Sequence, residues 1–141
     1  MIKKIKNKKI KSKRLLYIPI KVSSADKKYL SWINNPKINK YMGIEKKYTL
    51  KSLKSYIFKE IKNIFFWIIK NSETKEFIGT IKLSNFKNRT CYIGCLIGDK
   101  NYWNKGYGTE AKSRIVSFAF KDLKMNKIIS GVFKENQANL I

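Results

Sequence analysis

The sequence predicts one α/β domain with a mixed sheet, and three observations support that prediction. The chain has 141 residues, of which 43% are hydrophobic, and this is enough to bury one core. Stretches with strand-like and helix-like spacing of apolar residues follow one another in the order β-α-α-β-β-β-α-β. No internal repeat or low-complexity linker divides the chain. We therefore expect a single domain over residues 14–141, preceded by a basic arm over residues 1–13.

The first strand is expected over residues 14–22, an apolar run that follows the basic arm. Ser23 or Ser24 then suits the N-cap of a helix, with Asp26 in its first turn. The sequence Asn-Asn-Pro at residues 34–36 ends this helix. Its apolar face comprises Tyr29, Leu30, Trp32 and Ile33.

A turn or short helical piece is expected at residues 39–43, and Thr49 then caps a second helix that runs to about Lys62. Three strands come next, each bounded by polar turns, over residues 64–70, 77–86 and 90–98. The first of them is apolar almost throughout, which predicts a central position covered on both faces. Gly94 inside the third strand predicts a bulge or a close backbone approach.

The last complete helix is predicted by apolar residues at helical spacing, and residues 124–126 end it. Its apolar face comprises Ala111, Ile115, Phe118, Ala119 and Leu123. A final strand rich in β-branched residues is expected over residues 127–133. Residues 135–141 have the pattern of a turn and the beginning of another helix.

The chain is strongly basic, with 32 Lys and Arg residues against 9 Asp and Glu residues and a formal net charge of +23. Such a charge is typical of proteins that bind nucleic acid or another anionic surface. Only Arg14, Arg89 and Arg114 are arginines, the residue that nucleic-acid binders use for bidentate contacts. Heavy use of Lys, Ile and Asn together is typical of an AT-rich genome. We therefore favour a compositional origin of the charge over nucleic-acid binding.

Histidine is absent from the sequence, which excludes Ser-His-Asp and Cys-His catalysis and metals bound by histidine. Cys91 and Cys95 stand four residues apart without further ligands, so no metal site is expected. Both cysteines face the same side of a strand, and we expect free, buried thiols in a reducing cytoplasm. The longest apolar run, residues 64–69, is too short to span a bilayer.

Residues 101–111, NYWNKGYGTEA, are the most informative segment of the sequence. An apolar strand leads into this segment, two glycines lie at its turn, and a helix leaves it. That order brings main-chain N–H groups and the positive end of a helix dipole to one point, where anions bind, phosphates above all. The segment also matches the dinucleotide fingerprint G-x-G-x-x-A, but only 30 residues follow Ala111, too few for a dinucleotide-binding sheet. We therefore expect a pyrophosphate site for a nucleotide-type cofactor, with an ordinary glycine-rich turn as the alternative.

Residues 93–111, IGCLIGDKNYWNKGYGTEA, resemble the acetyl-CoA-binding motif of the GCN5-related N-acetyltransferases, the GNAT family. Residues 29–42, YLSWINNPKINKYM, resemble the first helix and following turn of one branch, which contains the ribosomal-protein N-terminal and amino-sugar acetyltransferases. Residues 127–136 resemble that branch's fifth strand and the asparagine after it. The resemblance covers about residues 13–141 and implies a mixed, mostly antiparallel sheet flanked by helices.

The resemblance also implies an acetyl-CoA-dependent N-acyltransferase whose acceptor is a primary amine, on an amino sugar or at a protein N-terminus. The backbone of Leu96, Ile97 and Gly98 would pair with the pantetheine arm. The pyrophosphate would be held by the amides of Asn104, Lys105, Gly106, Tyr107, Gly108 and Thr109. Asn136 would contact the cofactor near the thioester. The amine would attack the thioester directly, while the protein positions the reactants and polarises the carbonyl group.

The acceptor side of the site is marked by fewer residues. Trp32 and Tyr41 are candidates for lining it, with a place in the core as the alternative for each residue and the one we favour for Trp32. The family branch often carries a glutamate base where this chain has Tyr92, and a tyrosine with its ordinary pKa near 10 is a poor base at neutral pH. Glu45 is the other candidate base, with a solvated loop carboxylate as the alternative.

The sequence departs from the family pattern in two further places. Trp103 stands where the family usually has arginine or glutamine. The family also continues with a helix and two strands beyond the position of Ile141, so we expect a domain truncated at its C-terminus. Two alternatives to an active enzyme therefore stay open, a catalytically inactive remnant and a basic protein that binds nucleic acid or the ribosome.

Overall fold

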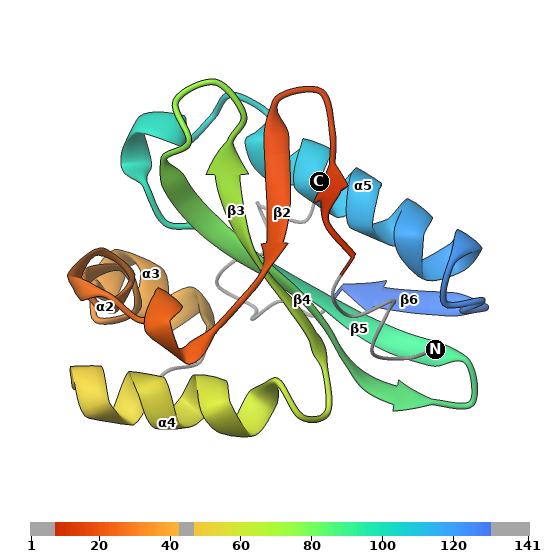
Figure 1. Ribbon diagram of the computed structural model, residues 1–141, viewed down its shortest axis with the longest axis horizontal. Helices are drawn as coiled ribbons and strands as arrows, with labels where there is room; N and C mark the ends of the chain where they lie inside the picture. The colour runs from red at the N-terminus through yellow and green to blue at the C-terminus, as the bar shows by residue number, and fades with distance from the viewer. Residues whose placement is uncertain (1–7, 43–46, 131–141) are drawn as a thin grey trace.

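The computed structural model describes residues 8–42 and 47–130 and shows one six-stranded sheet with helices on its two faces (Figure 1). The strands follow sequence order across the sheet, and neighbours pair antiparallel except for the parallel pair β5 and β6. The strands are β1 (Ile10–Lys11), β2 (Leu15–Pro19), β3 (Phe65–Asn71), β4 (Phe77–Lys87), β5 (Thr90–Ile97) and β6 (Lys127–Ser130).

The long helix α5 covers one face of the sheet, and three shorter helices cover the other (Figure 1). The helices are α2 (Lys27–Ile33), α3 (Pro36–Met42), α4 (Leu50–Glu60) and α5 (Tyr107–Lys121), with 3-10 turns η1 (Val22–Ser24) and η2 (Lys100–Tyr102). This arrangement confirms the predicted fold class, a mixed and mostly antiparallel sheet flanked by helices.

Each face of the sheet has its own apolar core, and the central strand β3 contributes to both. Trp67 and Ile69 pack in the core beneath α5, together with Phe118 of that helix. Phe66 and Ile68 point the other way, into the core beneath α2 and α4. The alternation of side chains along a strand explains this division, and it confirms the prediction of a central strand covered on both faces.

Two features near the N-terminus differ from the prediction. The strand β1 lies within the residues expected to form a basic arm, and Ile10 on this strand is buried at 3% exposure. Burying this apolar side chain against β2 favours strand pairing over a solvated tail. The N-cap of α2 is Asp26, whose carboxylate accepts a hydrogen bond from the amide of Tyr29. Ser24 instead ends η1, where its hydroxyl accepts a hydrogen bond from the amide of Lys21.

The second short helix also begins earlier than expected. Pro36, predicted only to end the preceding helix, opens α3, and proline suits a first helical position because an N–H group there has no helical partner. The cap of α4 is as predicted, since the Thr49 hydroxyl accepts a hydrogen bond from the amide of Ser52.

The bulge predicted at Gly94 is not found there, because Gly94 stays in regular register opposite Lys82. Irregularities in strand pairing occur instead between Ile69 and Lys70 and between Ser84 and Lys87. The end of the predicted last strand, the predicted start of a helix at residues 135–141, and the candidate residues Glu45 and Asn136 lie outside the described residues.

Candidate cofactor site at the β5–α5 turn

The turn between β5 and α5 brings six consecutive main-chain amides together, those of residues 104–109. Asn104 and Gly106 have φ angles of 60° and 80°, in the left-handed region that asparagine and glycine adopt most readily. Among the hydrogen bonds of the described residues, none uses the N–H groups of residues 104–109. The first amide that bonds back is that of Glu110, which donates to the carbonyl of Gly106. We call residues 104–109 the cradle.

The cradle has the electrostatics of an anion site. Its amides lie at the start of α5, a helix of 15 residues, where the partial positive charge of the helix is concentrated. The residues predicted to hold a pyrophosphate, Asn104, Lys105, Gly106, Tyr107, Gly108 and Thr109, all belong to it. A phosphate group placed here would meet N–H donors without displacing any hydrogen bond seen among the described residues.

The indole of Trp103 fixes the cradle to the end of β5. Its Nε1 donates a hydrogen bond of 2.6 Å to the main-chain oxygen of Ile97. The ring also packs against the core beneath α2 and α4. The side chain that departs from the family pattern therefore has a structural role here, holding the start of the turn against the strand.

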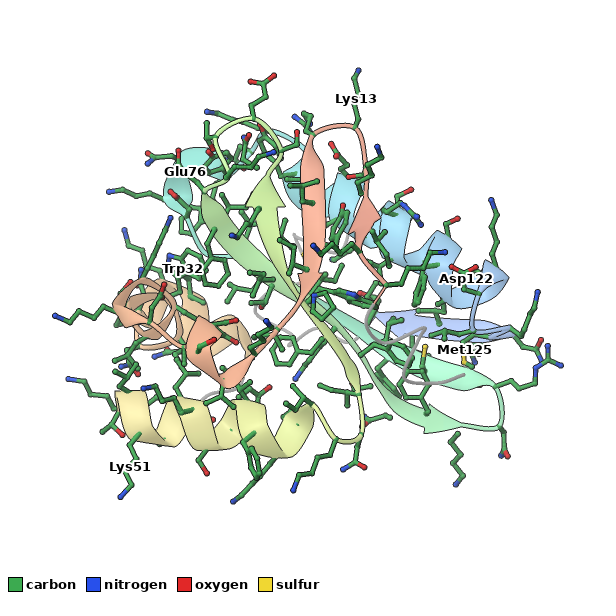
Figure 2. The ribbon with its side chains drawn as sticks, in the orientation of Figure 1. Lys13, Trp32, Lys51, Glu76, Asp122 and Met125 are labelled. Carbon is green, nitrogen blue, oxygen red and sulfur yellow. The ribbon has the colours of Figure 1, made fainter. Side chains whose placement is uncertain are left out.

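Gly98 lies directly against the ring of Trp32, so closely that a Cβ atom at Gly98 would collide with the indole. Trp32 is 6% exposed, and its ring centroid lies 4.9 Å from that of Phe77 in an edge-on contact. Figure 2 shows Trp32 between the α2–α3 pair and the sheet. The structure thus places Trp32 in the core, from where it contacts the strand end predicted to bind the cofactor.

A salt bridge between Arg14 and Glu110 at the first turn of α5 was missed by the sequence reasoning. Arg14 Nε lies 2.7 Å from Glu110 Oε1. Burial acts to raise the pKa of Glu110, but hydrogen bonds from Ser12 and Arg14 outweigh burial and bring that pKa below its usual value. The position of Glu110 in a first helical turn was visible in the sequence. Its partner stands 96 residues earlier, and no local pattern points to it.

The edge of β5 that follows Ile93 is the place predicted for the pantetheine arm. In the described part of the chain, β6 pairs with β5 only at residues 90–93, and residues 94–97 pair with β4 alone. Leu96 and Ile97 pair with Thr80 and Gly79 of β4, and two further main-chain contacts involve the groups predicted to bind the arm. The Ile97 carbonyl accepts from Trp103, and the Gly98 amide donates to the Ile78 carbonyl at 2.9 Å.

Tyr92 lies on the other face of the sheet from α5, because its neighbours Cys91 and Ile93 point into the core beneath that helix. Its side chain is 39% exposed and borders an open hollow of about 530 Å³. The hollow is lined by Asn85, Phe86, Lys87, Asn88, Thr90, Tyr92 and Ile129. None of these residues is a carboxylate, so the lining brings no acidic base to Tyr92. Tyr41, predicted together with Trp32 to line the acceptor site, lies in α3, and its side chain is outside the described part of the structure.

Both cysteines are free, Cys91 fully buried and Cys95 partly so, and burial raises the pKa of the Cys95 thiol to about 12. Within residues 8–42 and 47–130, no group of three or more Cys, Asp or Glu side chains is placed to hold a metal ion. None of the described helices combines the length and apolar character needed to cross a membrane.

Comparison with known proteins identifies relatives over most of the chain. The family model described as acetyltransferase (GNAT) domain matches residues 14–140. An N-acetyltransferase of Bacillus subtilis, YoaA, whose role is uncharacterized, is 31% identical over 114 residues, 75% of this chain and 63% of its own length. The acetyltransferase PseH of Campylobacter jejuni is 30% identical over 112 residues, 77% of this chain and 67% of its own.

Solved structures share the fold at lower identity. An acetyltransferase of the GNAT family from Bacillus anthracis gives a TM-score of 0.80 at 22% identity, covering 93% of this chain and 77% of its own. Spermidine N-acetyltransferase from Vibrio cholerae, solved with CoA and spermine, gives a TM-score of 0.78 at 20% identity. The match covers 90% of this chain and 76% of that protein's chain. The chain therefore shares its fold with these structures, and it spans less than two thirds of the length of the Bacillus subtilis relative.

Proposed function

The chain belongs to the acetyltransferase (GNAT) domain family, and on that premise we propose that it transfers an acetyl group from acetyl-CoA to a primary amine. The observation that supports this most directly is the cradle. Six consecutive amides without hydrogen-bond partners among the described residues, at the start of α5, suit the pyrophosphate of CoA.

In this proposal the remainder of the cofactor runs from the cradle along the free edge of β5. Leu96, Ile97 and Gly98 lie on that path, and β6 leaves this part of the edge unpaired among the described residues. The arm would add to the sheet as an extra strand does, through main-chain hydrogen bonds. Asn136 is proposed to contact the cofactor near the thioester, as the family resemblance implies.

The reaction needs few side chains. The amine nitrogen bonds to the thioester carbonyl carbon, the C–S bond breaks, and the CoA thiolate leaves with the electron pair. A proton from the amine passes to a base or to water. The protein contributes mainly by holding the reactants in line and by polarising the carbonyl oxygen. Tyr92 and Glu45 remain the candidates for handling the proton.

We propose an amino sugar as the acceptor, with a protein N-terminus as the alternative. The charges near β5 favour a neutral or anionic acceptor over a polyamine. Lys82 lies opposite Gly94 on the face that carries Tyr92, with its Nζ 2.8 Å from the Tyr56 hydroxyl. The two carboxylates that flank the cradle, Asp99 and Glu110, are both engaged in salt bridges.

A calorimetric titration with acetyl-CoA tests the cofactor half of the proposal, and a paired substitution at one cradle position sharpens it. Thr109→Pro removes one amide donor, and proline is tolerated in the first turn of a helix. Thr109→Ala keeps the amide and serves as the control, since the Thr109 side chain is exposed. We expect Thr109→Pro to weaken binding roughly tenfold and Thr109→Ala to bind like the wild type. Absence of binding to the wild type at millimolar acetyl-CoA would refute the proposal.

The acceptor half is tested by mass spectrometry of reaction products. Glucosamine, glucosamine 6-phosphate, a short peptide with a free N-terminus, and spermidine are incubated separately with the protein and acetyl-CoA. We expect acetylation of an amino sugar and none of spermidine. Acetyl-CoA binding with no acetylated product from any amine would favour the alternative of an inactive domain. A cytoplasmic location belongs to the same proposal and is supported by the two free thiols.

A further inference from the structure

One guanidinium group, that of Arg14, contacts three parts of the turn that forms the cradle. Arg14 precedes β2, and its Nη1 donates a hydrogen bond of 3.0 Å to the main-chain oxygen of Lys105. Its Nε donates to Glu110 at 2.7 Å, and its Cζ lies 3.9 Å from the ring centroid of Tyr107. A single side chain from the opposite end of the sequence therefore touches the loop, the first residue and the first turn of α5.

Arg14 is itself held in a defined position. The Glu110 carboxylate accepts hydrogen bonds from the main-chain amide of Arg14 at 2.8 Å and from the Ser12 hydroxyl at 2.6 Å. Ser12 is also within 2.8 Å of the Tyr17 hydroxyl, and Tyr17 is fully buried. The guanidinium group is thus connected to the core through a short chain of hydrogen bonds, which limits its movement relative to the cradle.

The charge of Arg14 lies at the end of α5 where a cation is least expected. The start of a helix carries partial positive charge, so a cation there is unfavourable unless anions lie beside it. Glu110 supplies one negative charge. Arg14 Nη2 takes part in none of the hydrogen bonds among the described residues, and it lies 3.6 Å from the position a Cβ would take at Gly106. A donor with no hydrogen-bond acceptor in the described part of the chain thus lies beside Gly106 of the cradle.

We propose that Arg14 is a positioning residue for the phosphates of CoA. It holds the Lys105 carbonyl so that the neighbouring amides remain directed at the ligand, and it places its own positive charge beside Gly106. This inference rests on the proposed function, since it names a further residue of the same cofactor site. The protein should therefore bind CoA more weakly when Arg14 is replaced. The lost affinity should come from contacts with the nucleotide part of CoA.

The test measures binding by calorimetry with three probes: CoA, its nucleotide fragment adenosine 3′-phosphate 5′-diphosphate, and pantetheine, which lacks phosphate groups. The variants are Arg14→Gln and Arg14→Lys. The control is Arg114→Gln, because Arg114 Nε likewise donates to a main-chain carbonyl, that of Lys11, but from the middle of α5. Circular dichroism and thermal unfolding verify that each variant is folded.

For Arg14→Gln we expect roughly tenfold weaker binding of CoA and of the nucleotide fragment, the loss typical of one charge-assisted hydrogen bond. Pantetheine should bind as to the wild type, because it does not reach the cradle. Arg14→Lys should recover only part of the affinity, since lysine keeps the charge but lacks the planar fork that serves Lys105 and Glu110 together. Arg114→Gln should leave all three affinities unchanged.

The possible outcomes separate this inference from the proposed function. A folded Arg14→Gln variant with wild-type affinity for CoA overturns the inference alone. An equal loss for pantetheine and for CoA also overturns it, because the role would then be general stability. If Arg14→Gln does not fold, Arg14→Lys decides, and wild-type affinity for the nucleotide fragment in that variant overturns the inference. A wild-type protein that binds no CoA overturns both proposals.

Discussion

The cradle follows the end of β5 and the hollow beside Tyr92 borders the start of the same strand, yet the two are built differently. The cradle is made of main-chain groups, and the turn that carries it is held by contacts from three directions: Trp103 on Ile97, Trp32 on Gly98, and Arg14 on Lys105. The hollow is made of exposed and half-buried side chains on β4, β5, β6 and the turn between β4 and β5, and Tyr92 on its border is 39% exposed.

This difference indicates which of the two proposed sites, the one for the cofactor or the one for the acceptor, is formed before its ligand binds. In the proposed function, a phosphate entering the cradle meets the amides of a turn that Trp103, Trp32 and Arg14 already hold, so little ordering is needed on binding. In the proposed function, an acceptor whose proton passes to Tyr92 would meet the hollow, where the side chains are exposed or half-buried. Substitutions around the cradle should therefore change stability and cofactor affinity together, whereas substitutions at the hollow should change neither.

The largest effect is expected for Trp32→Ala. Removing a buried tryptophan leaves a cavity beside Gly98 and Phe77 and should lower the free energy of unfolding by about 3–5 kcal/mol. Chemical denaturation measures this change, and affinity for CoA should fall with it because the end of β5 loses its support. Phe120→Ala on α5 is the control, since Phe120 is 43% exposed and its removal should cost no more than about 0.5 kcal/mol. Equal stability losses for the two variants would contradict the core placement of Trp32.

A smaller loss of unfolding free energy is expected for Gly98→Ala, which places a methyl group against the Trp32 ring. Overpacking of this kind typically costs about 1–3 kcal/mol. Gly94→Ala, four residues earlier and within β5, is the matched control, because its added methyl would lie 3.8 Å from Lys82, at ordinary contact distance. The melting temperature of Gly98→Ala should be lower than that of Gly94→Ala. Indistinguishable melting temperatures would show that the turn accommodates the added methyl group at little cost in stability.

The sequence predicted the order of strand, turn and helix at the cradle, but it did not predict the contacts that hold this turn, and the reason is physical. The cradle depends on the succession of neighbouring elements, a strand followed by Gly106 and Gly108 and then a helix. Such a succession can be predicted from the residues themselves. The same holds for the central strand β3 and for the Thr49 cap. Their signals lie within a few residues of the feature that they predict.

The supports depend on contacts between residues far apart in the chain. Arg14 meets Glu110 across 96 residues, and Trp32 of α2 meets Gly98 after the end of β5, so no periodic pattern could reveal either contact. The strand β1 was missed for a similar reason, since the two residues Ile10–Lys11 become a strand only by pairing with β2. Short strands and salt bridges of this type follow from tertiary structure and have no sequence signal of their own.

The salt bridge predicts a measurable dependence of stability on pH. The pKa of Glu110 in the folded protein lies below its ordinary value of 4.5, so the folded state binds this proton less readily than the unfolded state does. The ionised carboxylate therefore stabilises the fold above about pH 4.5, and that contribution is lost as the pH falls through the lowered pKa. Denaturation at a series of pH values should show a steeper acid loss for the wild type than for Glu110→Gln. The exposed Glu73→Gln should follow the wild type, and identical slopes for all three would contradict the role of Glu110.

The smallest effects are expected for Tyr92→Phe, which keeps the ring and removes the hydroxyl. Because the side chain is exposed, unfolding free energy should change by no more than about 0.5 kcal/mol, and CoA affinity should stay the same. General acid–base catalysis typically contributes about 10²–10⁴-fold to a rate, so kcat for the acetylated amine reports directly on proton transfer. We expect a loss of less than about tenfold, because positioning on β5 and direct attack by a neutral amine carry the reaction. A loss of a hundredfold or more in kcat, with cofactor affinity unchanged, would instead show that Tyr92 takes part in proton transfer. The hollow would then contribute a group to the chemical step.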